Sequence, residues 1–397
     1  MKKRLIEIEG HHSEYYCFGW DYFGPFLYGF SRWLYQEAIK NGYRKVFFFS
    51  RDGYMMEKGF NLFNDTQIET EYVFFSRKSI RQALLWKCTT LESTLKFLPW
   101  ERFLSVGKVL EFFGFDEAER NEITKKSNID PEKDIPYDHI CKDSTIQKLY
   151  DENKDQIRQK SIEQDNLLTL YIEQIGMRGR CAVVDIGWHG SMQYYLECFF
   201  EEHKMDTVLD GFYIGINPTV PLKSKVHGYI YNENERYKRK QLLCFFGGYE
   251  KLFQGFDGST YGYKLTEENK IEPVFAQYEY ALEKDAEIIC AIKEWQQGAL
   301  DFIRTARIDE HKYNDKELVY PLIHFGMHPS LADTKLFSFF YNVDGTKVFY
   351  TAQKKLHKYR FNELIHALSN SPWKTGFMKS VFKVPFPYFT VYRMIRK

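Results

Sequence analysis

Two aspartates and a serine stand where an α/β protein places its ligand site. Asp52, Ser76 and Asp185 each follow a short run of apolar residues. Such a run is typical of a strand covered on both faces, and parallel sheets bind ligands beyond the carboxyl ends of their strands. We therefore expect the three side chains to converge on one pocket. The three runs are 46–49, 72–75 and 181–184.

Two carboxylates that share a pocket need a positive charge between them, because they otherwise repel each other. Either Mg²⁺ or a basic side chain meets this need, and Arg51, Arg77 and Lys160 are the basic candidates. A simpler interpretation is that Asp52 and Asp185 only cap the helices that follow them. Because several polar residues stand at the ends of the expected strands, we favour the interpretation that Asp52 and Asp185 belong to a ligand-binding site.

Neighbouring residues have side chains suited to a phosphorylated sugar. Ser76 and Arg77 offer a hydroxyl and a guanidinium to phosphate oxygens. Trp188 offers a ring face on which a sugar can stack, and His189 titrates near neutral pH, as a general acid/base must. The alternatives are a basic surface patch at Ser76 and Arg77, and a structural role for His189.

The elements around these residues predict an α/β fold with a parallel core sheet. Apolar runs alternate with helical patterns, as in strand–helix–strand units. The Gly-rich stretch 243–263 predicts loops and short strands. The expected helices are 25–41, 54–62, 160–175, 191–200 and 281–307, and the expected fourth strand is 211–216.

Composition limits the classes of partner. The formal net charge of +1 over 397 residues gives no general attraction to nucleic acid. The apolar runs are only as long as strands, the start MKKRLIEIEG lacks a signal-peptide core, and the seven cysteines form no C-x-x-C pair. We therefore expect a cytoplasmic protein. Its basic, aromatic tail, residues 373–397, allows at most peripheral contact with the inner face of a membrane.

Three segments carry a resemblance to a known family. VFFFSRDGYMM, YVFFSRKS and VVDIGWHGSMQ resemble one branch of the haloacid-dehalogenase-like superfamily. That branch comprises predicted hydrolase-like proteins encoded among bacterial genes for capsule, O-antigen and other surface polysaccharides. The opening FGPFLYGFSRWLYQEA and the segment LLCFFGGYEKLFQGFDGSTYGY also look like this branch, so the resemblance covers residues 18–280.

The resemblance implies a role for each of five residues. Asp52 falls on the position of the general acid/base, and Ser76 falls on a phosphate-binding position. Asp185 falls on the metal-binding position, where with Asp52 it would hold Mg²⁺, and Lys160 is the candidate for a phosphate-binding lysine. Ser50 replaces the nucleophilic aspartate of the superfamily, and a hydroxyl is a poor substitute as nucleophile and as ligand. Water or a sugar hydroxyl is therefore the more plausible attacker.

The resemblance also implies a division of the chain. Residues 18–77 and 156–240 would form the haloacid-dehalogenase-like core, with a Rossmann-like parallel sheet. Residues 78–155 would form a helical cap inserted over the pocket, and residues 241–397 a mixed, mainly helical extension.

The expected function is a step in surface-polysaccharide assembly. The substrate would be a phosphorylated sugar or a nucleotide-sugar, and the reaction a phosphoryl transfer or phosphate hydrolysis. The alternative is a degenerate binding module that assists a partner glycosyltransferase without catalysis. A third, weaker option is glycosyl transfer by this chain. The sequence has no Asp-x-Asp motif near a nucleotide-binding strand to support it.

Overall fold

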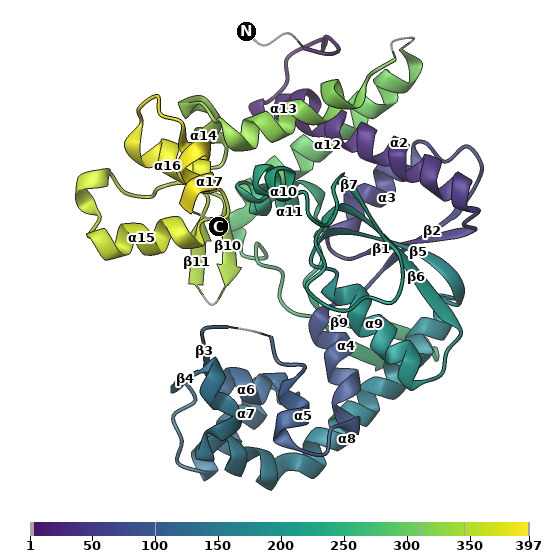
Figure 1. The fold of residues 1–397 in the computed structure, drawn as a ribbon, viewed down its shortest axis with the longest axis vertical. Coiled ribbons are helices and arrows are strands. Elements are labelled where there is room, and N and C mark those ends of the chain that lie inside the picture. Colours follow the sequence, from purple (N-terminus) through teal and green to yellow (C-terminus); the bar gives the residue numbers. More distant parts are fainter. Residues whose placement is uncertain (1–3, 100, 310–311, 345, 396–397) are drawn as a thin grey trace.

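A five-stranded parallel sheet lies at the centre of the fold. The computed structural model describes residues 4–99, 101–309, 312–344 and 346–395. The sheet has the order β2-β1-β5-β6-β7, and all its neighbours pair in parallel (Figure 1). The expected α/β class with a parallel sheet is thus confirmed. The strands are β1 (Lys45–Phe49), β2 (Glu69–Val73), β5 (Gly179–Trp188), β6 (Thr207–Ile216) and β7 (Val226–Tyr231).

Alternate side chains of β1 enter two separate cores, because successive residues of a strand point to opposite faces. Val46 and Phe48 pack with α2, α3 and α12 on one face. Phe47 and Phe49 pack with α4, α8 and α9 on the other. Both faces are covered, and this explains why the strand reads as a continuous apolar run. These helices are α2 (Gly24–Asn41), α3 (Gly53–Asn61), α4 (Arg77–Leu84), α8 (Ser144–Gln174), α9 (Ser191–Glu202) and α12 (Ala286–Ile308).

Two strand ends differ from expectation. Strand β2 ends at Val73, so Ser76 lies three residues beyond it. Strand β5 continues past Asp185 to Trp188, because that stretch still pairs with β6 up to Ile216. Asp185 is therefore inside a strand, although it lies beyond the last residue of β5 that pairs with β1, Val184.

Residues 78–155 are mostly helical, as expected, and they include one unexpected hairpin. Strands β3 (Phe103–Ser105) and β4 (Asp134–Pro136) pair antiparallel. A hydrophobic cluster that includes Leu104, Ile135 and Ile157 serves this part alone. Helix α8 begins in this cluster and continues onto the sheet, so it starts well before the expected residue 160. The other helices here are α5 (Leu91–Leu95), α6 (Val106–Phe112) and α7 (Glu117–Lys126).

The prediction of loops and short strands over 243–263 was wrong for its first half, which forms helix α11 (Phe246–Phe253). Its two glycines suggested a loop, but here they allow close packing. A side chain on Gly247 would collide with Pro372, and one on Gly248 would collide with the Phe245 ring. The second half contains strand β8 (Thr260–Leu265), which forms a hairpin with β9 (Ile271–Phe275).

The C-terminal part consists of helices and one hairpin, and its last three helices, drawn in yellow, gather at one edge of the molecule (Figure 1). Within the described ranges, no helix combines the length and the apolar character needed to cross a membrane. The remaining elements are α1 (Glu14–Phe18), η1 (Gly19–Phe23), η2 (Leu85–Lys87), η3 (Tyr137–Lys142), α10 (Arg236–Leu243), η4 (Glu283–Asp285), α13 (Asp315–Met327), α14 (Leu331–Leu336), β10 (Tyr341–Asp344), β11 (Thr346–Phe349), η5 (Leu356–Lys358), α15 (Phe361–Asn370), α16 (Lys374–Phe382) and α17 (Tyr388–Ile395).

Candidate functional site

A cavity of about 660 Å³ lies beyond the carboxyl end of β1. Ser50 and Asp52 enter it from the loop after β1, and Ser76 and Arg77 enter it from the start of α4. Because β1 lies between β2 and β5, the polar residues that follow these three strands meet at one edge of the sheet. Asp52 and Ser76 thus line one cavity, as the apolar runs predict, whereas Asp185 is not among the residues that line it.

Asp185 lies close to Asp52 in this region. Burial raises the pKa of Asp52 well above its ordinary value, and the charges of Asp185 and Glu250 raise it further. Burial also raises the pKa of Asp185, to about 7, although its carboxylate accepts a hydrogen bond of 2.8 Å from the Ile186 N–H. Both carboxyl groups therefore hold a proton more tightly than an exposed aspartate does.

Glu250 is a third carboxyl group of the site, and it comes from α11. It lines the cavity, and burial raises its pKa. It accepts a hydrogen bond of 3.3 Å from the Trp188 indole N–H. Glu250 stands in the segment LLCFFGGYEKLFQGFDGSTYGY, but the sequence did not single it out as a site residue, because its helix was expected to be a loop.

Basic side chains balance these acids. Lys251 is only 2% exposed and bonds to Glu279, and Arg51 donates to the same carboxylate at 3.2 Å. Burial lowers the pKa of Lys251 against the attraction of Glu279. Burial opposes the ionisation of Glu279, but Lys251 and Arg51 outweigh it and leave the pKa of Glu279 below its ordinary value. Arg77 is the third cation, and its charge lowers the pKa of Asp185.

Ser76 has a structural role that limits its use as a phosphate ligand. Its hydroxyl donates to the Thr260 carbonyl at 2.6 Å and accepts from the Ser79 N–H at 3.0 Å, which caps α4. A hydroxyl has one proton to donate, so in this arrangement Ser76 has none left for a phosphate oxygen. Arg77, one residue further on, keeps an exposed guanidinium at the cavity.

Three other expected residues lie away from the cavity wall. Lys160 pairs with Glu119 at 2.7 Å and lines a different pocket, so the structure does not bring it to Asp52. The spacing from Asp185 placed it on the correct helix, but α8 carries it out toward residues 78–155. Trp188 and His189 are not lining residues either; Trp188 acts on the site through its bond to Glu250, and His189 is exposed.

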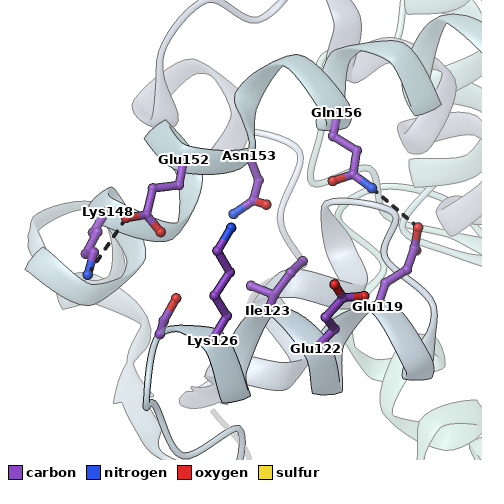
Figure 2. Close-up of a pocket in the computed structure, with 9 residues that line it drawn as sticks. Glu119, Glu122, Ile123, Lys126, Lys148, Glu152, Asn153 and Gln156 are labelled. Atoms are coloured by element: carbon purple, nitrogen blue, oxygen red, sulfur yellow. Dashed lines mark hydrogen bonds and ion pairs between the residues drawn. The ribbon is translucent and has the colours of Figure 1, made fainter.

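A second hollow, of about 500 Å³, lies between α7 and α8 (Figure 2). Several of its polar lining residues are already engaged with one another. Lys148 lies 3.8 Å from Glu152, and Gln156 donates to Glu119 at 3.5 Å. Acids and bases alternate here without a cluster of one kind, so this hollow offers no chemistry comparable to that of the first cavity.

The donor set of the cavity does not favour a metal ion. Among the residues that the structure describes, no three His, Cys, Asp or Glu side chains are placed to share one ion. Arg51, Arg77 and Lys251 already bring positive charge to Asp52 and Asp185. Two of the basic side chains that the sequence offered as counter-ions, Arg51 and Arg77, are thus present near the carboxyl groups. Mg²⁺ stays a prediction, and no step below depends on it.

Comparison with known proteins adds no relative to this picture. No family model matches the chain, and no curated protein matches it either.

The raised pKa of Asp185 predicts a pH-dependent gain of stability in Asp185→Asn. Between its ordinary pKa of 3.8 and about 7, the folded state holds a proton that the unfolded state has lost. Stability of the parent protein therefore falls as pH rises through this window, by about 1.4 kcal/mol per pH unit. Asparagine cannot ionise. We expect the variant's advantage in unfolding free energy to grow by about 2–3 kcal/mol from about pH 5 to about pH 8.

Urea unfolding at the two pH values measures this difference. The control is Asp155→Asn at an exposed position of α8, which should change stability by less than about 0.5 kcal/mol at both pH values. An advantage of Asp185→Asn that stays constant with pH would contradict the raised pKa.

Proposed function

We propose that the cavity binds a phosphorylated sugar or nucleotide-sugar and transfers its phosphoryl group to water or to a sugar hydroxyl. One observation carries the proposal: buried carboxyl groups with raised pKa values, Asp52 and Glu250, line a single cavity together with several cations. A phosphate ester needs both, because cations hold its oxygens and a proton must reach the leaving oxygen. The resemblance of the segments around Asp52 and Asp185 to polysaccharide-locus proteins supports the sugar part.

Arg77 is the residue best placed to hold the phosphate. Its guanidinium is exposed at the first turn of α4, where the helix dipole also favours an anion. Arg51 and Lys251 share Glu279, so they contribute net positive charge near the cavity rather than free donors. An incoming phosphate would therefore displace solvent around Arg77 without breaking the buried ion pairs.

Asp52 is the proton donor in the proposed reaction. Burial raises its pKa well above the ordinary value, so it holds a proton more tightly than an exposed aspartate and can give that proton to the leaving oxygen as the bond from that oxygen to phosphorus breaks. The attacking oxygen forms the new bond to phosphorus, and Glu250 accepts the proton that the attacker loses. Ser50 is not the attacker in this scheme. Its hydroxyl is directed to the Phe75 carbonyl at 3.5 Å, and serine lacks the carboxylate of the aspartate that it replaces.

Ligand binding tests the proposal independently of turnover. Calorimetric titration of hexose 1-phosphates and nucleoside-diphosphate sugars should show binding, whereas unphosphorylated hexoses should bind far more weakly. Arg77→Met removes a charged hydrogen-bond donor and should weaken phosphate binding about 10–100-fold. Arg158→Met, at an exposed position of α8, is the control and should bind as the parent does. Equal affinity in both variants would exclude Arg77 as the phosphate ligand.

A non-catalytic function is the second candidate. The hydroxyls of Ser50 and Ser76 both donate to backbone carbonyls, so neither is available for the role of its counterpart in the resembling superfamily. In that case the cavity would present a sugar phosphate to a glycosyltransferase. Tight binding of a phosphorylated sugar, without turnover by the parent protein in the presence of Mg²⁺, would favour this module.

A further inference from the structure

The C-terminal part of the chain has an unusual combination of charge and exposed apolar surface. Residues 346–397 contain eleven Lys and Arg and a single acidic residue, whereas the whole chain has a formal net charge of only +1. The same part holds eight of the 22 large hydrophobic side chains that are exposed in the described structure. They are Leu356, Phe361, Ile365, Phe382, Val384, Phe386, Met394 and Ile395.

The most concentrated apolar exposure runs from Phe382, the last residue of α16, to residue 387, just before α17; we call residues 382–387 the C-terminal loop. Its residues are all exposed, and Phe382, Val384 and Phe386 are 40%, 51% and 55% exposed. Three apolar side chains this open within five residues expose a surface that water solvates poorly. Lys383 lies among them, as a cation between apolar neighbours.

The loop is held in shape by its own contacts. The Val384 carbonyl accepts hydrogen bonds from the Tyr388 hydroxyl at 3.0 Å and from the Lys379 ammonium at 3.3 Å. The rings of Phe382 and Phe386 lie 6.3 Å and 5.6 Å from that of Tyr388. A loop that is already ordered loses little conformational freedom when its apolar side chains become buried.

We propose that this surface docks on an anionic lipid bilayer, with the C-terminal loop entering the interface and neighbouring lysines such as Lys379 and Lys383 meeting the headgroups. Apolar side chains interspersed with cations suit the boundary between acyl chains and anionic headgroups. A second copy of the chain fits less well, because two surfaces of net charge near +10 repel each other. A nucleic acid would meet the charge and could stack on the rings of Phe382 and Phe386, but it would leave the aliphatic Val384 and Pro385 in water, whereas a bilayer buries them.

Flotation with lipid vesicles tests the proposal on the full chain. The protein should float with vesicles of equal parts phosphatidylglycerol and phosphatidylcholine and stay behind with phosphatidylcholine alone, and salt should weaken the binding. Val384→Ser/Phe386→Ser should bind about tenfold more weakly or worse, since it removes apolar burial. Lys383→Gln should bind about fivefold more weakly.

The matched control is Val208→Ser/Leu265→Ser, which removes apolar side chains of similar exposure, 45% and 54%, elsewhere on the molecule. It should float as the parent does, and all variants should keep the parent's melting temperature. The proposal fails if the parent does not float, floats equally with neutral vesicles, or binds DNA more tightly than the vesicles. It also fails if the loop variant floats as well as the parent, or if it abolishes a dimer, which would make a second copy the occupant.

Discussion

Replacing Asp52 with asparagine is expected to lower turnover of a phosphorylated sugar by about 10²–10⁴-fold, the usual contribution of a general acid or base. Asparagine keeps the shape of the side chain but has no proton of suitable acidity for the leaving oxygen. The affinity for the substrate should change far less, because Arg77 supplies the phosphate contact. The loss should therefore fall on kcat, and kinetics under saturating substrate measure it.

Asp257→Asn is the control for this prediction. Burial raises the pKa of Asp257 too, but that residue does not line the cavity, so its variant should keep the parent's kcat. If Asp52→Asn kept most of the parent's turnover, Asp52 would not be the proton donor. A leaving group that needs no proton, such as nitrophenolate, should restore much of the variant's rate, and this rescue would separate proton donation from a loss of folding.

Glu279→Gln is expected to destabilise the folded state by about 3–5 kcal/mol, as does the loss of one partner from a buried ion pair. Glu279 is the shared partner of Lys251 and Arg51, and Lys251 is almost fully buried. Without the carboxylate, the ammonium stays among Gln254, Arg51 and the Tyr280 ring with no balancing charge in contact. Urea unfolding at neutral pH measures the loss.

The exposed pair between Lys148 and Glu152 supplies the contrast. Their side chains are 59% and 49% exposed, so Glu152→Gln should cost less than about 1 kcal/mol. The double variant Lys251→Met/Glu279→Leu should recover part of the stability that Glu279→Gln loses, since it removes the buried ammonium together with its partner and leaves only Arg51, whose side chain is 29% exposed, without that carboxylate. Equal losses in Glu279→Gln and Glu152→Gln would show that the buried pair is not the source of the effect.

Much of the sheet was predictable from sequence because its signal is local. The runs at β1, β5 and β6 are apolar without interruption, since each strand is covered on both faces. Pro25 and Gly42 mark the ends of α2 by their own backbone preferences, and Gly42 has the left-handed φ of 69° that ends the helix. Strand ends were less exact, because pairing with β6 extends β5 past Asp185.

The remainder of the candidate site depends on contacts between segments far apart in the chain. Gly247 and Gly248 promote a loop locally, yet close packing against Pro372 and Phe245 makes them part of a helix. That helix brings Glu250 and Lys251 to the cavity, and although both lie in a segment that carries the resemblance, no role was assigned to either from the sequence.

By itself, the sequence determined that Asp52 and Asp185 lie beyond apolar runs that form strands of one parallel sheet, because apolar patterning and strand–helix alternation are properties of neighbouring residues. Only the tertiary structure decided what surrounds these carboxyl groups. Burial and the charge of Glu250 raise the pKa of both, while Arg51 and Lys251 lower that of Asp52 and Arg77 lowers that of Asp185. These effects depend on distances between elements that no local pattern encodes.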